Sequence, residues 1–133
     1  MRGDVQVRIA SDSDVVVARQ KGRELANQGG FGLTDVALIA AVISELARNI
    51  LLYAGHGEIV LTLLDEGGKR GIRIVAADEG PGIADVDRAI QNGYSTSGGL
   101  GLGLPGVKRV VDEFDIVSRA GHGTIVTATK WTR

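Results

Sequence analysis

The distribution of glycine most constrains what this chain can fold into. The 133 residues include twenty glycines. Most of them fall in six clusters, at 29–32, 55–57, 67–71, 80–82, 98–106 and 121–123. Glycine in such clusters marks turns and places where two stretches of backbone come close. The clusters therefore divide the chain into short segments, each long enough for a strand or a helix.

Alternation of apolar and polar residues between the clusters predicts strands. The pattern occurs in the segments 5–9, 59–63 and 72–76. Apolar pairs at 116–117 and at 125–126, the second followed by residues up to Trp131, predict two further strands. The sequence DEGGKRG connects the second segment to the third, and the glycine turn at 120–123 connects the last two. Both connections are typical of antiparallel hairpins.

Four segments between these strands are expected to be helical. They are a helix capped by the SDSD sequence at 11–14 and running to about Gln28, a long helix over 35–54 capped by Thr34, a short one over Asp85–Gln91, and another over Leu104–Glu113. The resulting order, β α α β β α α β β, predicts an α/β (α+β) two-layer sandwich. Its helices would cover one face of a mostly antiparallel sheet. We expect one domain over residues 1–133.

Composition excludes several classes of function. The net charge of −1 provides no general attraction to nucleic acid or to an anionic membrane. The chain has no cysteine, so disulfides and thiolate metal sites are impossible. The longest apolar stretch, 36–53, is interrupted by polar residues, which disfavours a membrane span. We therefore expect a cytoplasmic protein that binds neither nucleic acid nor membrane.

The stretch Gly101–Gly106 matches the dinucleotide-binding pattern G-x-G-x-x-G. In a dinucleotide-binding fold this pattern directly follows a buried parallel strand. Here the preceding residues, 91–97, are polar, and no P-loop sequence is present. The dinucleotide interpretation therefore fails. What remains is a glycine-rich loop that leads into a helix N-terminus, where free backbone amides suit phosphate oxygens. A plain surface loop is equally compatible with this pattern.

Glu45 and Asn49 form a polar pair on the long helix. They are four residues apart, so they lie one turn apart on a common side that is otherwise apolar. Ser44 and Arg48 are expected on a separate, polar face. The amide oxygen of Asn49 could bind Mg²⁺, and the carboxylate of Glu45 could accept a proton from a hydroxyl. A solvated helix edge is the alternative.

Two further motifs follow predicted strands. Asp78 ends a strand and is followed by the sharp turn Gly80-Pro81-Gly82, where a carboxylate could accept a hydrogen bond from the adenine amine. An ordinary turn explains the same residues. The sequence Gly121-His122-Gly123-Thr124 forms a tight turn with a hydroxyl group, and alone it indicates only a hairpin.

Together, these four motifs resemble the conserved boxes of the GHKL ATPase/kinase superfamily, in the same order. Residues 45–49 resemble its N box, 78–82 its D-x-G-x-G box, 99–104 its G-x-G-x-G box, and 121–124 its G-x-G-T box. The stretches SELARNILLYAG and YSTSGGLGLGLPGVKR, and the closing KW, are similar to the switch serine/threonine kinases of the stressosome, in the anti-sigma-factor kinase family. The resemblance implies the two-layer fold of this superfamily.

The resemblance also implies roles for individual residues. Glu45 would be the catalytic base and Asn49 the Mg²⁺ ligand, while Asp78 would bind the adenine amine of ATP. The loop from about Tyr94 to Gly103 would close over the phosphates. The residues expected to bind nucleotide are Asn49, Asp78, Gly80, Gly82, Ile83, Thr96, Ser97, Gly99, Leu100, Gly101, Leu102, Gly103, Leu104, Lys108 and Thr124.

Departures from other branches of the superfamily narrow the expected substrate. The only histidines, His56 and His122, lie in glycine turns, and no histidine-bearing helical hairpin precedes the domain, which disfavours a histidine kinase. The resemblance implies that the substrates are STAS-domain stressosome proteins. It also implies partner switching in the stress response, in which released kinase activates a PPM-type phosphatase. A nucleotide-dependent sequestering protein of the anti-sigma class and a plain ATPase are the alternatives.

Overall fold

The structure is a computed structural model that describes residues 4–81, 103–119 and 121–132. These residues form five strands and three helices. In chain order the elements are β1 Val5–Ile9, α1 Asp12–Gln28, α2 Leu33–Tyr53, β2 Gly57–Glu66, β3 Lys69–Asp78, α4 Gly103–Val110, β4 Glu113–Arg119 and β5 Gly123–Trp131. The short helix expected over Asp85–Gln91 lies outside the described residues.

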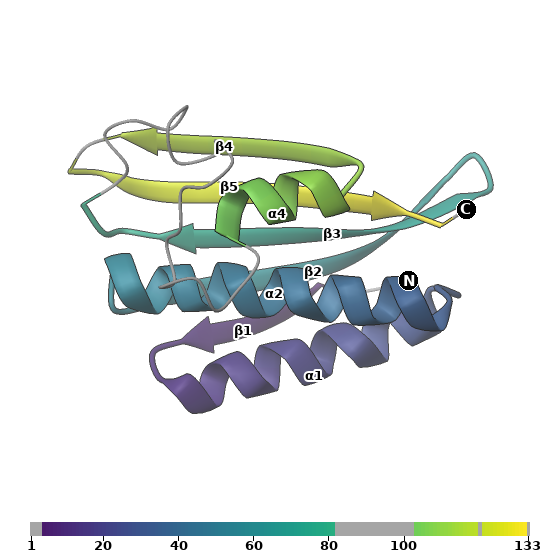
Figure 1. Cartoon of the computed structure of the whole chain (residues 1–133), viewed down its shortest axis with the longest axis horizontal. Coiled ribbons are helices and arrows are strands. Elements are labelled where there is room, and N and C mark those ends of the chain that lie inside the picture. The colour runs from purple at the N-terminus through teal and green to yellow at the C-terminus, as the bar shows by residue number, and fades with distance from the viewer. Residues whose placement is uncertain (1–3, 82–102, 120, 133) are drawn as a thin grey trace.

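The strands form one antiparallel sheet in the order β1-β2-β3-β5-β4. Figure 1 shows α1, α2 and α4 in one layer on a single face of this sheet. The β2–β3 and β4–β5 hairpins form as the glycine turns predict. The predicted two-layer architecture is therefore confirmed.

Alternation in the strands produces the core because every second side chain points to the helices. Ile59 and Leu61 of β2 and Ile72 and Ile74 of β3 are almost fully buried. α2 packs against them with an apolar stripe at helical spacing, formed by Ile39, Ile43, Leu46, Ala47 and Ile50. Hydrophobic burial at this interface fixes the position of α2 over the centre of the sheet.

By length and composition alone, α2 could cross a membrane. In the structure, however, ten of its residues are buried inside the protein, and it contacts β2 and β3. It is therefore the core helix of the domain.

Two helix boundaries differ from the sequence expectation. The residue that caps α2 is Gly32 rather than Thr34, and the backbone N–H of Val36 donates to the Gly32 carbonyl at 2.9 Å. At the other boundary, α4 ends at Val110 instead of Glu113. The cause is competition from the sheet, since the N–H of Asp112 already donates to the Thr129 carbonyl at 2.9 Å.

Ser44 also departs from the prediction, because only 4% of it is exposed. It shares a side of α2 with Ala40, four residues before it, and Ala47, three residues after it, and both are buried. Burial of α2 thus extends beyond the apolar stripe. Arg48 is exposed, as expected.

Candidate functional site

The candidate site lies at the end of the sheet where β3 ends and β5 begins. Asp78, the last residue of β3, is paired with Gly57 of β2 on one side and with Thr124 of β5 on the other. Asp78 lies an even number of residues after Ile74 and Ala76, so its side chain points to the helix layer as theirs do. The antiparallel register thus brings a carboxylate and a hydroxyl side by side beneath α2.

A small cavity joins these residues to the helices. It is lined by Leu46, Asn49, Ile50, Tyr53, Ala76, Asp78, Leu104, Thr124 and Val126, contributed by α2, β3, α4 and β5. The structure therefore brings together four of the predicted site residues, namely Asn49, Asp78, Leu104 and Thr124. The cavity measures about 30 Å³, roughly the volume of one water molecule, so it must widen to admit a base.

Glu45 lies one turn before Asn49 on α2 but does not line this cavity. Glu45 is fully buried, and Asn49 is half-buried. A carboxylate in such an environment needs compensating polar contacts. The predicted pair is thus present on one side of the helix, with Asn49 facing the cavity and Glu45 deeper in the protein.

Glycine permits close backbone approach around Asp78. A Cβ atom on Gly80 would lie 2.6 Å from the Cβ of Ala54. A Cβ atom on Gly123 would lie 2.2 Å from the carbonyl oxygen of Asp78. The backbone N–H of Gly80 also donates to Asp78 Oδ1 at 2.9 Å, which orients the carboxylate. The glycines of the predicted boxes therefore have a direct steric role here.

The other predicted residues divide into two groups. Gly103, with a φ of 67°, begins α4 and is buried, whereas Lys108 is exposed on the same helix. The remainder lie outside the described residues, namely Gly82, Ile83, Thr96, Ser97, Gly99, Leu100, Gly101 and Leu102.

The described side chains are consistent with a Mg²⁺ ion held mainly by the phosphates of a bound substrate and by few protein oxygens. In the described part of the chain, no group of three or more His, Cys, Asp or Glu side chains could hold a metal ion. Mg²⁺ keeps several waters and takes one or two protein oxygens together with substrate phosphates. Asn49, which lines the cavity, carries an amide oxygen that could serve as such a ligand, and Glu45 lies one turn away on α2.

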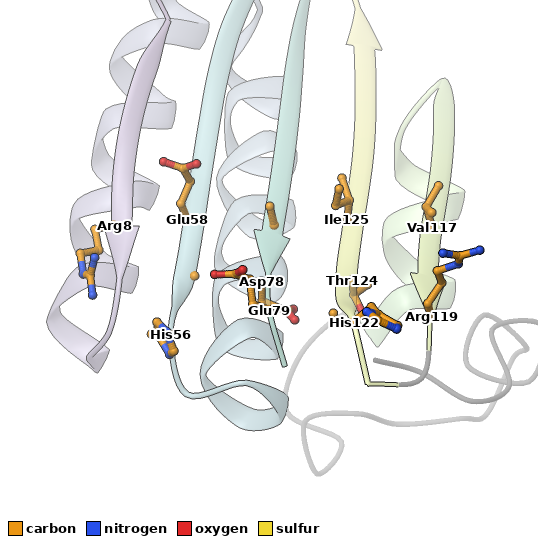
Figure 2. A pocket seen from close by; sticks show the side chains of 13 residues that line it. Arg8, His56, Glu58, Asp78, Glu79, Val117, Arg119, His122, Thr124 and Ile125 are labelled. Atoms are coloured by element: carbon orange, nitrogen blue, oxygen red, sulfur yellow. The ribbon is translucent and has the colours of Figure 1, made fainter. Parts of the chain in front are cut away.

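A second, larger cavity of about 630 Å³ lies at the same end of the sheet (Figure 2). Arg8, Glu58, Val117 and Ile125 line it from the sheet face opposite the helices. Asp78 and Thr124 border both cavities, so they form the wall between them. The smaller cavity contains more of the predicted site residues, and we therefore place the functional site there despite its size.

Two residues with hydroxyl groups at this site were not identified from the sequence. Tyr53 lines the cavity four residues after Asn49, so its helical spacing was an available signal. Ser118 of β4 is paired with Thr124, and their hydroxyl oxygens are 2.8 Å apart. The contact between Ser118 and Thr124 is revealed only by the register of the β4–β5 hairpin.

Comparison with known proteins identifies the family. Residues 34–132 match the family described as histidine kinase-, DNA gyrase B-, and HSP90-like ATPase. The serine/threonine-protein kinase RsbT of Bacillus subtilis (strain 168) is 54% identical over 127 residues, which cover 96% of each chain. An anti-sigma F factor of Caldanaerobacter subterraneus is 30% identical, over 74% of this chain and 72% of that protein.

A solved structure agrees with the fold. The crystal structure of the RsbU and RsbW domains of a Mycobacterium tuberculosis protein superposes with a TM-score of 0.69 at 21% sequence identity. The match covers 99% of this chain and 33% of that one. The chain therefore belongs to the histidine kinase-, DNA gyrase B-, and HSP90-like ATPase family, and it is a homologue of the serine/threonine-protein kinase RsbT.

Proposed function

We propose that this protein is a cytoplasmic, ATP- and Mg²⁺-dependent kinase that phosphorylates serine or threonine on STAS-domain stressosome proteins. After release from them it would bind and activate a PPM-type phosphatase. The observation that carries this proposal is the 54% identity to RsbT across 96% of both chains. The convergence of Asn49, Asp78 and Thr124 on one cavity supports it.

Asp78 and Thr124 would recognise adenine. Gly80 orients the Asp78 carboxylate by donating to Oδ1, and the carboxylate can still accept a hydrogen bond from the exocyclic amine. Leu46, Ile50 and Val126 provide apolar surface for the base in the same cavity. A base that lacks the amine would leave the half-buried carboxylate without that partner, which is unfavourable.

Asn49 and Glu45 would act at the phosphate end. The Asn49 amide oxygen would be a ligand of Mg²⁺, which when bound neutralises charge on the phosphates. Glu45 would accept the proton of the substrate hydroxyl as its oxygen bonds to the γ-phosphorus and the bond from that phosphorus to ADP breaks.

Transfer of labelled γ-phosphate from ATP to a purified STAS-domain protein tests the proposal. We expect transfer by the wild-type protein, and a loss of about 10²–10⁴-fold in Glu45→Gln with nucleotide affinity retained. Glu66→Gln is the matched control, because Glu66 is exposed at the other end of β2. Equal rates of transfer by the wild-type protein and Glu45→Gln would contradict the assignment of Glu45 as the base.

A second candidate function is nucleotide-dependent sequestration of a partner with little turnover. The 30% identity to an anti-sigma F factor favours it. Pull-down of the partner with and without Mg²⁺-ATP separates the two functions. Nucleotide-dependent binding without phosphoryl transfer would support sequestration over catalysis.

A further inference from the structure

Ser118 and Thr124 form a pair of hydroxyl groups at the wall of the small cavity. They are directly opposite each other on β4 and β5, and their oxygens are 2.8 Å apart. Thr124 is 8% exposed and lines the cavity, whereas Ser118 is half-buried and does not line it. Ser118 Oγ is also 3.2 Å from the Gly123 carbonyl oxygen, to which it can donate. Among the described residues, Thr124 is the one that links Ser118 to the cavity.

Each hydroxyl has one hydrogen, so the bond between the two can run in either direction. If Ser118 donates to the Gly123 carbonyl, Thr124 donates to Ser118 and presents only lone pairs to the cavity. If Ser118 donates to Thr124, the Thr124 hydrogen is available to the cavity. In both arrangements Ser118 bonds to Thr124 and restricts its rotamer.

The second arrangement complements adenine. Asp78, the neighbour of Thr124 in the sheet, accepts hydrogen bonds and suits the exocyclic amine. The adjacent ring nitrogen N1 of adenine is an acceptor, so it needs a donor beside Asp78. Thr124 supplies that donor when Ser118 donates to it, and donation from Ser118 polarises the Thr124 hydroxyl and strengthens its bond to N1.

We infer that Ser118 is a positioning residue of the nucleotide site, which orients the Thr124 hydroxyl toward N1 of adenine. The inference rests on the proposed function, since it requires that ATP binds between Asp78 and Thr124. It assigns no contact between Ser118 and the nucleotide.

A double-mutant cycle with Ser118→Ala and Thr124→Val tests the inference, with Mg²⁺-ATP affinity measured by isothermal titration. We expect Ser118→Ala to weaken ATP about 3- to 10-fold in the wild-type background. The same substitution should have no further effect when residue 124 is Val. Ser118→Thr keeps a hydroxyl on the side chain and should restore most of the affinity.

A triphosphate of 1-deazaadenosine, which lacks N1, provides an independent measurement. Ser118→Ala should bind this analogue as tightly as the wild-type protein does. Equal losses for ATP and the analogue, equal losses in both backgrounds, or no loss for ATP would overturn the inference while leaving the proposed function intact. A wild-type protein that binds no ATP would refute the proposed function, and the inference with it.

Discussion

Replacement of Gly123 by alanine tests the close contact of β3 and β5 at the site. Gly123 has a φ of 94°, which is unfavourable for residues with a side chain. An added Cβ would also lie 2.2 Å from the Asp78 carbonyl oxygen and 2.9 Å from the Glu79 Cα. Both are backbone atoms, so rotation of a side chain cannot relieve the overlap.

Gly121 is the matched control in the same turn. It has a φ of 82°, but a Cβ there would meet no atom of the described residues within 4 Å beyond its chain neighbours. The unfavourable φ should cost about 1–2 kcal/mol in either variant. In Gly123→Ala the overlap should add about 1–3 kcal/mol, the usual cost of overpacking.

Thermal unfolding followed by circular dichroism measures the difference. For a chain of this length the entropy of unfolding is about 0.3 kcal/mol per degree, so Tm should fall by about 4–7 °C in Gly121→Ala and about 7–18 °C in Gly123→Ala. ATP affinity should fall only in Gly123→Ala, because relief of the overlap moves Asp78 away from Thr124. Equal Tm shifts and equal affinities would refute the reasoning.

Three further substitutions have definite expected outcomes. Asn49→Ala should lose most Mg²⁺-ATP affinity by isothermal titration, since no other amide of α2 lines the cavity; unchanged affinity would contradict the metal role. Asp78→Asn should weaken ATP more than GTP in competition titrations, because an amide can present a donor to the adenine amine; equal effects would contradict the adenine assignment. Lys130→Met should lower the free energy of unfolding by about 1.5–3 kcal/mol in urea titrations, because Lys130 Nζ, nearly fully buried, donates to the Val110 carbonyl at 3.0 Å; a smaller change would show that the bond contributes little.

The sequence predicted the architecture because its local signals agree with its tertiary contacts. Val5, Val7 and Ile9 share the inner face of β1, where Val7 and Ile9 are buried and Val5 is partly buried against the core. At the start of α1, Ser11 caps the helix and its N–H donates to the Asp14 carboxylate at 3.1 Å.

The predicted end of α4 was wrong because a residue distant in the sequence competes for the backbone there. The end of α4 depends on Asp112, whose carboxylate accepts the Trp131 N–H at 2.7 Å from nineteen residues away. No local propensity of residues 104–113 indicates that contact. The prediction that Ser44 lies on a polar face was wrong for a related reason, since the burial of its side of α2 depends on the packing of the whole helix layer.

The residues of the candidate site also divide into those that local motifs predicted and those that depend on nonlocal contacts. Asn49, Asp78 and Thr124 belong to short motifs, and the structure brings them to one cavity. Ser118 has no motif in the sequence that we identified, and its importance depends on being opposite Thr124 in the register of β4 and β5. Local motifs thus predicted side chains that line the cavity, whereas a side chain behind its wall is identified only from strand register.

Helix α4 contacts the end of β5 that is remote from the site and also lines the site itself. Lys130 donates to the Val110 carbonyl at the last residue of α4 and lies 3.8 Å from Asp35 in the first turn of α2. With eight residues, α4 is about 12 Å long. Its N-terminal end holds Leu104 in the wall of the cavity beside Asn49. The lysine thus binds one end of the helix whose other end lines the cavity.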